Sequence, residues 1–393
     1  MKKFIVLFLV FVFWGCKSRK TGKIPKNIRN LKNLTVIPAN AKPEYHISFQ
    51  KDGSYGSTKK VMIGLIGAFS VDDSGRVYIS DIQKNTIDVF NSNGNYLTHI
   101  GRKGRGPGEF EVGPYLKIVS KRLFAYDATS HRISIFSLNS FHLLQTINLK
   151  STNKMGIKAL HDTHFHQILF TNDNRFLVGF EGIMHVPQHV QKNILGSQYI
   201  HYYLMNNDGR IVTKQLFKLK DAPELKATIM GKIPFQTNFL LFRQPVVVIA
   251  RNGSIFATKS NFFLIREYGP NGKYNHSIYY PYKKVPLTSK SATNVGIPDY
   301  VLKRWDSMDL PKFWPVLKNI IIDSHNRLWV SSIVKNMKMY QWWLLTPTGK
   351  LIARFDWPRT KSIQVIKNGF IYTKENNNKG LMRIVRYKFQ LKP

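Results

Sequence analysis

One pattern recurs six times along this chain: a polar turn followed by a short apolar strand, as in Val-Tyr-Ile-Ser at 77–80. The first two copies align without a gap, 46 residues apart. Strand-like units that repeat at such a period indicate a β array that is stacked or closed on itself. The six copies begin near Val77, Leu123, Phe176, Ile255, Leu328 and Phe370.

The first copy shows what one repeat contains. Turn residues such as Asp-Ser-Gly-Arg at 73–76 and Asn-Ser-Asn-Gly at 91–94 separate short apolar runs. Four antiparallel strands joined by polar turns make one propeller blade. Six repeats therefore predict an all-β, six-bladed β-propeller. The strands expected in the first blade are 69–72, 77–81, 86–90 and 96–100.

The ends of the array need a partner, because a propeller that does not join end to end leaves backbone groups exposed at its edge strands. A strand-like segment at 44–49 precedes the first blade. We expect this strand to complete the last blade and to close the ring. A segment between the fourth and fifth repeats, roughly 285–315, has stretches with helical character such as 300–305 and predicts a short helical insertion between blades 4 and 5.

The N-terminus resembles a bacterial lipoprotein signal. Lys2 and Lys3 precede an apolar run at 4–14, too short to span a bilayer as a helix, and Gly15 comes before Cys16, the only cysteine of the chain. We predict a signal peptide at 1–15, lipidation of Cys16 and a flexible basic tether at 16–43. The propeller would then fill 44–393. One cysteine permits no disulfide within the chain.

The charge of the chain is extreme, with 59 Lys and Arg against 22 Asp and Glu and a formal net charge of +37. Self-repulsion on this scale favours counterions or a polyanionic partner. Nucleic acid, anionic lipid and acidic polysaccharide all satisfy that condition, and charge alone does not choose among them.

Two segments carry a resemblance to known families. The stretch 71–81 with 87–90 resembles an NHL-type repeat, and the Gly-rich loop 101–110 resembles a hallmark of six-bladed, NHL-repeat or TolB-like propeller lipoproteins of Bacteroidota-like bacteria. The Pro-Lys-Phe-Trp-Pro run at 311–315 resembles a second feature of those proteins. The resemblance extends over about 44–391 and implies the propeller fold without any assigned chemistry. Such proteins are usually closer to neutral.

The loop 101–110 supplies the candidate ligand-binding residues Arg102, Lys103 and Arg105, which could contact an anion. Its glycines are better explained by a tight crossing between two blades. A P-loop would require Gly-Lys-Ser/Thr before a helix, which this loop lacks. The interleaved basic and aromatic residues at 335–343 could stack on sugars or bases, although Trp342 and Trp343 also fit packing within and between blades.

No metal, cofactor or catalytic set is predicted. His164 and His166 would share a strand face, near His161, His185 and His189, but a hydrogen-bonded His cluster explains them as well. Asp81 and Asp127 recur at one position of the repeat and fit a bond that stabilises the blade better than a shared metal site. No spacing points to a catalytic triad.

We therefore expect a monomeric envelope lipoprotein, held on the periplasmic side of the outer membrane rather than at the inner membrane. Its propeller would be a non-catalytic binding module for a protein, anionic polysaccharide or lipid. Two alternatives stay open: a hydrolase or lyase with a divalent metal in the channel, and a nucleic-acid-binding NHL-type propeller. Nucleic acid is not the expected partner, because an exported protein rarely meets it.

Overall fold

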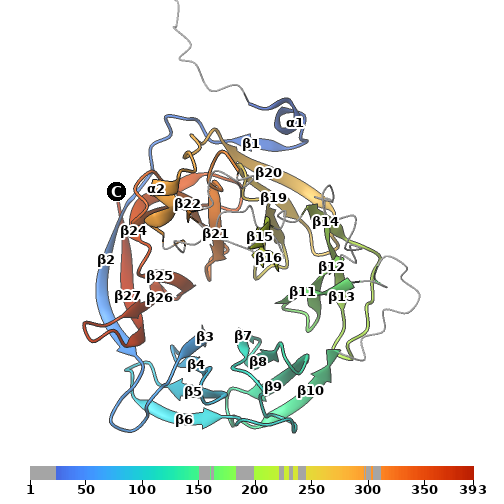
Figure 1. Ribbon diagram of the computed structural model, residues 1–393, viewed down its shortest axis with the longest axis vertical. Helices are drawn as coiled ribbons and strands as arrows, with labels where there is room; N and C mark the ends of the chain where they lie inside the picture. The colour runs from blue at the N-terminus through green and yellow to red at the C-terminus, as the bar shows by residue number, and fades with distance from the viewer. Residues whose placement is uncertain are drawn as a thin grey trace, which may run out of the picture.

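The computed structural model describes residues 24–149, 160, 163–182, 199–220, 225–229, 233–237, 245–295, 297, 302–303 and 311–393. In it, six blades surround a central channel (Figure 1). Each blade is a sheet built around four antiparallel strands, and the innermost strand of each blade faces the channel. This confirms the predicted six-bladed β-propeller.

The first three blades follow one another along the chain in simple up-and-down order. Blade 1 contains β3 (Ile66–Val71), β4 (Val77–Asp81), β5 (Thr86–Phe90) and β6 (Tyr96–Ile100). Blade 2 contains β7 (Tyr115–Val119), β8 (Arg122–Asp127), β9 (Arg132–Ser137) and β10 (Leu143–Asn148). Blade 3 contains β11 (Thr163–Phe170), β12 (Phe176–Gly182), β13 (Tyr199–Met205) and β14 (Phe217–Lys220).

The last three blades include the N-terminal strands. Blade 4 contains β17 (Val246–Ile249), β18 (Ile255–Thr258), β19 (Phe263–Tyr268) and β20 (Tyr274–Tyr280), with β1 (Leu34–Val36) added outside β20. Blade 5 contains β21 (Leu317–Ile322), β22 (Leu328–Ile333), β23 (Met339–Leu345) and β24 (Leu351–Pro358). Blade 6 contains β25 (Ser362–Lys367), β26 (Phe370–Asn376), β27 (Met382–Lys392) and β2 (His46–Tyr55).

The six repeated strands of the sequence are the second strands of the six blades, β4, β8, β12, β18, β22 and β26. These strands are apolar on both faces because each blade packs between two neighbours. In β4, Val77 and Ile79 pack towards blade 6, whereas Tyr78 packs towards blade 2. A strand buried on both faces carries a nearly continuous apolar run, which explains why this strand was the easiest to recognise.

The ring closes as expected. β2 pairs antiparallel with β27 from His46↔Lys392 to Tyr55↔Ile384, so the N-terminal strand is the outermost strand of the C-terminal blade. The Tyr55 hydroxyl accepts a hydrogen bond from Arg386 Nη1 at 2.8 Å. This pairing supplies partners for backbone groups of β27 that an open ring would leave exposed.

The segment before the ring corrects one prediction. The stretch 24–43 is not simply a tether, because it contains α1 (Lys26–Arg29) and β1, and β1 pairs in parallel with β20. Ile28 of α1 is buried with Leu264 and Tyr279 of blade 4. The apolar residues between the lysines therefore anchor this segment to the propeller. The predicted signal peptide, Cys16 and the first part of the tether lie outside the described residues.

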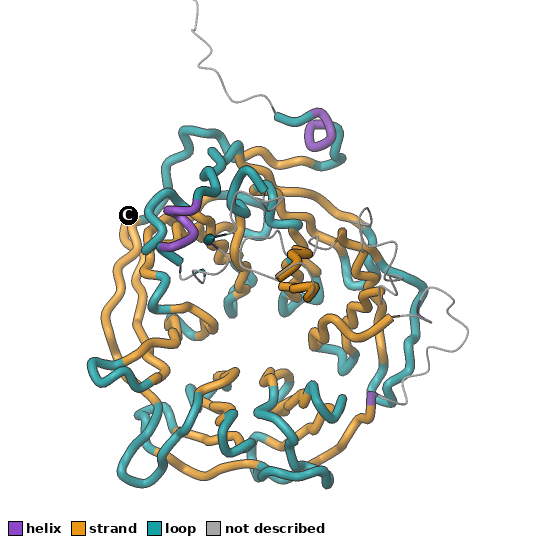
Figure 2. The backbone as a smooth tube through the Cα atoms, in the orientation of Figure 1, coloured by secondary structure: helices purple, strands orange, loops and turns teal. Residues whose placement is uncertain are grey.

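Two further elements lie in connections between blades. The connection between blades 4 and 5 contains α2 (Ser289–Thr293), which Figure 2 shows as a short helical turn, and this confirms the predicted helical insertion. Trp314 is buried against it and donates to Ser291 Oγ at 3.0 Å. Most of the expected helical stretch 300–305 lies outside the described residues. The connection between blades 3 and 4 contains the hairpin β15 (Leu225–Ile229) and β16 (Ile233–Thr237).

Candidate functional site at one mouth of the channel

The turns between the first and second strands of the blades all lie at the same end of the channel. Together with the ends of the innermost strands, they line a cavity of about 620 Å³. Every blade contributes to the lining, so the ring itself builds this site. A cavity of this size is typical of small-molecule sites in proteins.

Two of these turns are fixed by a buried aspartate. In blade 1, Asp72 accepts bonds from the backbone and side chain of both Ser74 and Arg76, and from the hydroxyl of Tyr78. Burial raises the pKa of Asp72, but the hydrogen bonds from Ser74 and Arg76 outweigh that effect and leave the pKa below its ordinary value.

Blade 5 repeats the arrangement. Asp323 accepts bonds from the backbone of His325, from the backbone and guanidinium of Arg327, and from the indole of Trp329. Both aspartates are thus neutralised by an arginine four residues later. Their carboxylates accept hydrogen bonds within the turn and are therefore not free to bind a cation in the channel.

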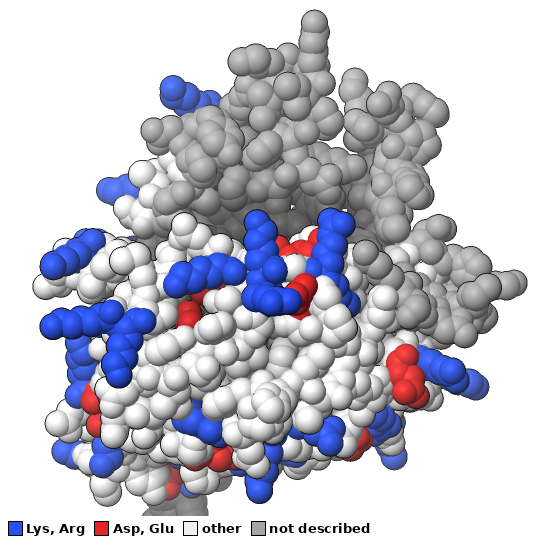
Figure 3. Space-filling view, turned by 90° about the horizontal axis from the view of Figure 1, so that it is seen from below, with Lys and Arg blue, Asp and Glu red and all other residues white. Residues whose placement is uncertain are grey.

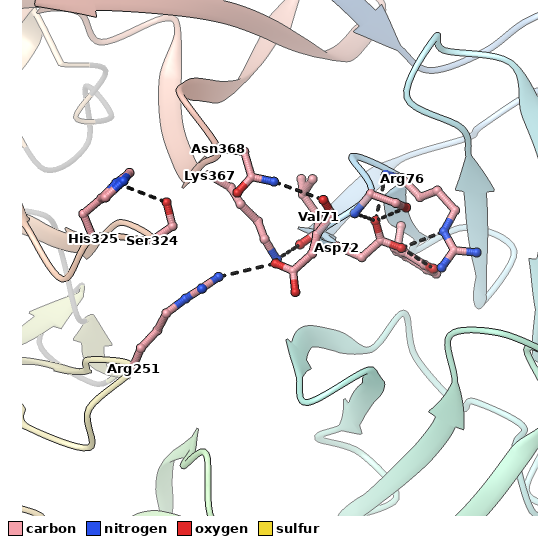
Figure 4. Close-up of polar contacts among 11 residues, drawn as sticks. Val71, Asp72, Arg76, Arg251, Ser324, His325, Lys367 and Asn368 are labelled. Atoms are coloured by element: carbon pink, nitrogen blue, oxygen red, sulfur yellow. Dashed lines mark hydrogen bonds and ion pairs between the residues drawn. The ribbon is translucent and has the colours of Figure 1, made fainter.

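The next residue of the blade 1 turn behaves differently. The Asp73 side chain is 77% exposed, and its Oδ1 lies 2.9 Å from Lys367 Nζ and 3.4 Å from Arg251 Nη2. Figure 4 shows Arg251 and Lys367 approaching this point from different blades. The hydrogen bond from Lys367 is the main cause that holds the pKa of Asp73 below its ordinary value, and Arg251 contributes as well. Three blades therefore meet at one carboxylate.

Two lysines of blade 2 line the same cavity as well, Lys117 and, in the turn after its strand, Lys121. Lys117 of β7 has an exposed side chain with no hydrogen-bond or ion-pair partner among the residues that the structure describes. Desolvation of its ammonium group inside the channel is the main cause that lowers the pKa of Lys117, and the charges of Lys367 and Arg251 lower it further. Lys117, Arg251 and Lys367 are called the channel cations below, and the one exposed carboxylate in the lining is that of Asp73.

Bonds between neighbouring turns hold these groups in place. Lys367 Nζ also donates to the Val71 carbonyl at 2.9 Å, and Asn368 Nδ2 donates to the Asp73 carbonyl at 3.1 Å (Figure 4). The Arg251 amide donates to Asn326 Oδ1 at 2.9 Å. These contacts hold Lys367 Nζ and the backbones of Asp73 and Arg251 without using the Asp73 carboxylate.

The loop 101–110 with the predicted ligand-binding residues does not reach this cavity. Arg102 Nε lies 2.7 Å from Glu109 Oε1, and Arg105 Nε lies 2.5 Å from Glu111 Oε1. Lys103 forms a backbone bridge with the buried Phe110. The loop is closed on itself between β6 and β7, as its glycines led us to expect, while both arginine side chains remain at the surface.

The candidate metal ligands are only partly described. His166 Nδ1 lies 2.9 Å from Glu181 Oε2, whereas His161, His185, His189 and the His164 side chain lie outside the described residues. Within the described part of the chain, no group of three or more His, Cys, Asp or Glu is placed to hold a metal ion.

The repeated aspartates have the predicted structural role. Asp81 accepts bonds from the backbone amides of Gly64 and Leu65, in the segment that enters blade 1. Asp127 accepts a bond from the Glu111 amide at 2.7 Å, in the segment that enters blade 2. Each carboxylate ties the incoming connection to the second strand of its blade.

The aromatic pair in 335–343 also packs as expected. Trp343 contacts Phe263 of blade 4, with ring centroids 5.1 Å apart, and Trp342 lies in the cluster between blades 5 and 6. Neither indole is a surface stacking platform. On the side of the molecule seen in Figure 3, the described Lys and Arg side chains lie in several separate places rather than in one patch.

Sequence reasoning missed the channel cations. Asp73, Arg251 and Ser324 occupy the same position of three aligned turns, so the repeat alignment could have placed them at one end of the ring. What it could not give is their approach across the channel, since that depends on how the ring closes. Lys117 and Lys367 lie on innermost strands of blades 2 and 6, whose first turns are shorter.

Comparisons with known proteins agree with the architecture. Residues 57–176 match the family model described as a 6-bladed beta-propeller. This match covers less than half of the chain and includes blades 1 and 2. None of the curated proteins compared with the sequence matches it.

Solved structures with a similar fold include a member of the DUF4221 family from Bacteroides vulgatus, with a TM-score of 0.50, 12% identity and coverage of 89% of this chain and 99% of that chain. An inferred exported protein from Bacteroides fragilis has a TM-score of 0.48, 11% identity and coverage of 91% and 99%. Virginiamycin B lyase from Staphylococcus aureus has a TM-score of 0.42 and 11% identity, with coverage of 87% of this chain and 99% of that chain. At such identities the likeness concerns the fold alone.

Proposed function

We propose that this propeller is a non-catalytic binding module that takes an anionic group of its partner at the channel mouth. The observation that carries the proposal is the excess of positive charge in the cavity, whose lining holds the three channel cations and Lys121 but only one exposed carboxylate, that of Asp73. Lys117 is influenced by the like charges of Lys367 and Arg251 and has no ion-pair partner among the described residues, and such an arrangement favours an incoming anion. The binding site is then a defined part of the ring and not the basic surface as a whole.

We further propose that the protein works in the cell envelope as a lipoprotein anchored through Cys16, on the periplasmic side of the outer membrane. The support is the N-terminal sequence, with its short apolar run and its single cysteine. No helix in the described ranges is long and apolar enough to cross a membrane.

The anchor is tested by labelling cells with a fatty acid analogue. We expect label on the wild-type protein, none on Cys16→Ser, and unchanged label on the control Ser18→Ala. Equal labelling of the wild type and Cys16→Ser would refute the anchor.

The binding module is tested with immobilised polyglutamate, a carboxylate polymer, and the full chain in solution. We expect a combined Lys117→Gln, Arg251→Gln, Lys367→Gln variant to lose about tenfold in affinity, since charge-assisted contacts are lost. The control carries Lys379→Gln, Lys388→Gln and Lys392→Gln, which remove the same charge from exposed positions outside the cavity. Biolayer interferometry at fixed salt gives both affinities, and equal losses in the two variants would contradict the channel site.

A further inference from the structure

We propose that Asp73 occupies the place of a ligand carboxylate, and that the channel mouth binds a small polycarboxylate which displaces it. This inference rests on the proposed function and names the ligand class of the same site. It starts from a contrast between neighbouring acidic residues. Asp72 is 2% exposed and is bonded on both oxygens, whereas the Asp73 side chain is 77% exposed.

The contacts of Asp73 show that a carboxylate fits between a cation of blade 4 and a cation of blade 6. Arg251 comes from the turn after β17 in blade 4, and Lys367 comes from the end of β25 in blade 6. Both reach the same oxygen, Asp73 Oδ1. The other oxygen, Asp73 Oδ2, forms no hydrogen bond or ion pair with any described residue, so the carboxylate is held by one atom only.

Lys367 is better fixed than the carboxylate that it binds. The Lys367 side chain is 13% exposed and is also bonded to the Val71 carbonyl. Asn368 holds the backbone of Asp73, not its carboxylate. Asp73 can therefore swing outward by a side-chain rotation while the turn and Lys367 stay in place. A ligand carboxylate that enters meets Lys367 already in position, and the Arg251 guanidinium can move onto it from the neighbouring turn.

The charge of the cavity suggests more than one carboxylate on the ligand. The arginines Arg76 and Arg327 neutralise Asp72 and Asp323 within their own turns. Once Asp73 has left, the channel cations have no acidic partner in the lining. One ligand carboxylate replaces Asp73, and a second one neutralises Lys117, whose pKa already reflects the charges of the other two.

The walls of the cavity limit the size of the ligand and favour a particular carbon skeleton. Half-buried aliphatic side chains of four innermost strands line the same cavity, and its volume of about 620 Å³ admits a small molecule. Such walls suit a short hydrocarbon skeleton between the carboxylates. These wall residues are Leu116, Ile118, Ile249, Ile321 and Val365.

The test is calorimetric titration of the full chain with citrate and succinate, with acetate and inorganic phosphate as comparison anions. We expect citrate and succinate to bind more tightly than acetate or phosphate. Asp73→Asn removes the internal competitor, so its affinity for citrate should rise by about three- to tenfold, because the apparent affinity of a site scales with the fraction of it that is free. Asp208→Asn removes the same charge from an exposed turn of blade 3 and should leave the affinity unchanged.

Lys367→Gln should instead lower the affinity for citrate by at least about tenfold, because a charge-assisted contact with the ligand is lost. A thermal melt of each variant shows that the ring is intact. The inference is overturned if neither the wild type nor Asp73→Asn binds citrate or succinate, if Asp73→Asn binds more weakly, or if phosphate alone binds. The proposed function survives those results when polyglutamate binding still depends on the channel cations, and both fall when it does not.

Discussion

At the residue scale, the buried aspartates of this protein differ in how fully their carboxylates are hydrogen-bonded. Asp72, Asp81, Asp127 and Asp323 are buried and accept several hydrogen bonds from nearby turns or connections. Asp88 of β5 is also buried, yet its Oδ2 has no hydrogen-bond partner among the described residues. A buried carboxylate oxygen without a partner is costly in its charged form.

Asp88 should therefore make the stability depend on pH. Burial is the main cause that raises its pKa from 3.8 to about 6, with Asp81 adding to the rise and Lys84 and His99 opposing it. Between these two values the folded protein keeps a proton that the unfolded chain releases, so the free energy of unfolding falls as pH rises from about 4 to 6. Above that range the cost stays constant.

We expect Asp88→Asn to be more stable than the wild type at pH 7.5 by about 1–2 kcal/mol, after allowance for partial solvation, and to match it near pH 4. Chemical denaturation at both pH values measures the difference. Asp208→Asn, in an exposed turn, should show no such dependence. A variant that is equally stabilised at both pH values would show that the charge of Asp88 is not the cause.

At the scale of the elements, the strands that the sequence revealed are those buried on both faces. All six repeated segments are second strands, and the turn at 73–76 forms as expected, with Gly75 at a φ of +83°. β2 was predictable because an open ring leaves edges unpaired. In contrast, β1 has three residues, pairs in parallel with a strand more than 200 positions away, and has no repeat that would reveal it.

The channel mouth escaped prediction for a related reason. Turn residues vary freely in a repeat because each blade needs only the backbone shape of its turn, so Asp73 and Arg251 looked like ordinary polar turn residues. Their role becomes visible only through their contacts with residues of other blades across the channel. Repeated strands predict the scaffold, while the contacts across the channel follow only from its closure.

At the scale of the whole molecule, most acidic residues that the structure describes form hydrogen bonds or ion pairs within the fold. Several of them bind arginines within the blades or join neighbouring strands, such as Asp52 with Arg386 in blade 6 and Glu44 with Lys350. The remaining Lys and Arg are spread over the described surface seen in Figure 3. A formal charge of +37 then leaves a folded particle that repels itself.

Screening should therefore stabilise the protein. Because the Debye length falls from about 20 Å at 20 mM salt to about 6 Å at 300 mM, repulsion between distant lysines weakens, and we expect Tm to rise by roughly 3 °C over this range of NaCl. The variant with Lys379→Gln, Lys388→Gln and Lys392→Gln should melt higher than the wild type at 20 mM salt and depend less on added salt. Differential scanning fluorimetry measures both. A Tm that is independent of salt, or that falls with it, would mean that local ion pairs such as Asp52 with Arg386 outweigh the repulsion, since salt weakens those pairs.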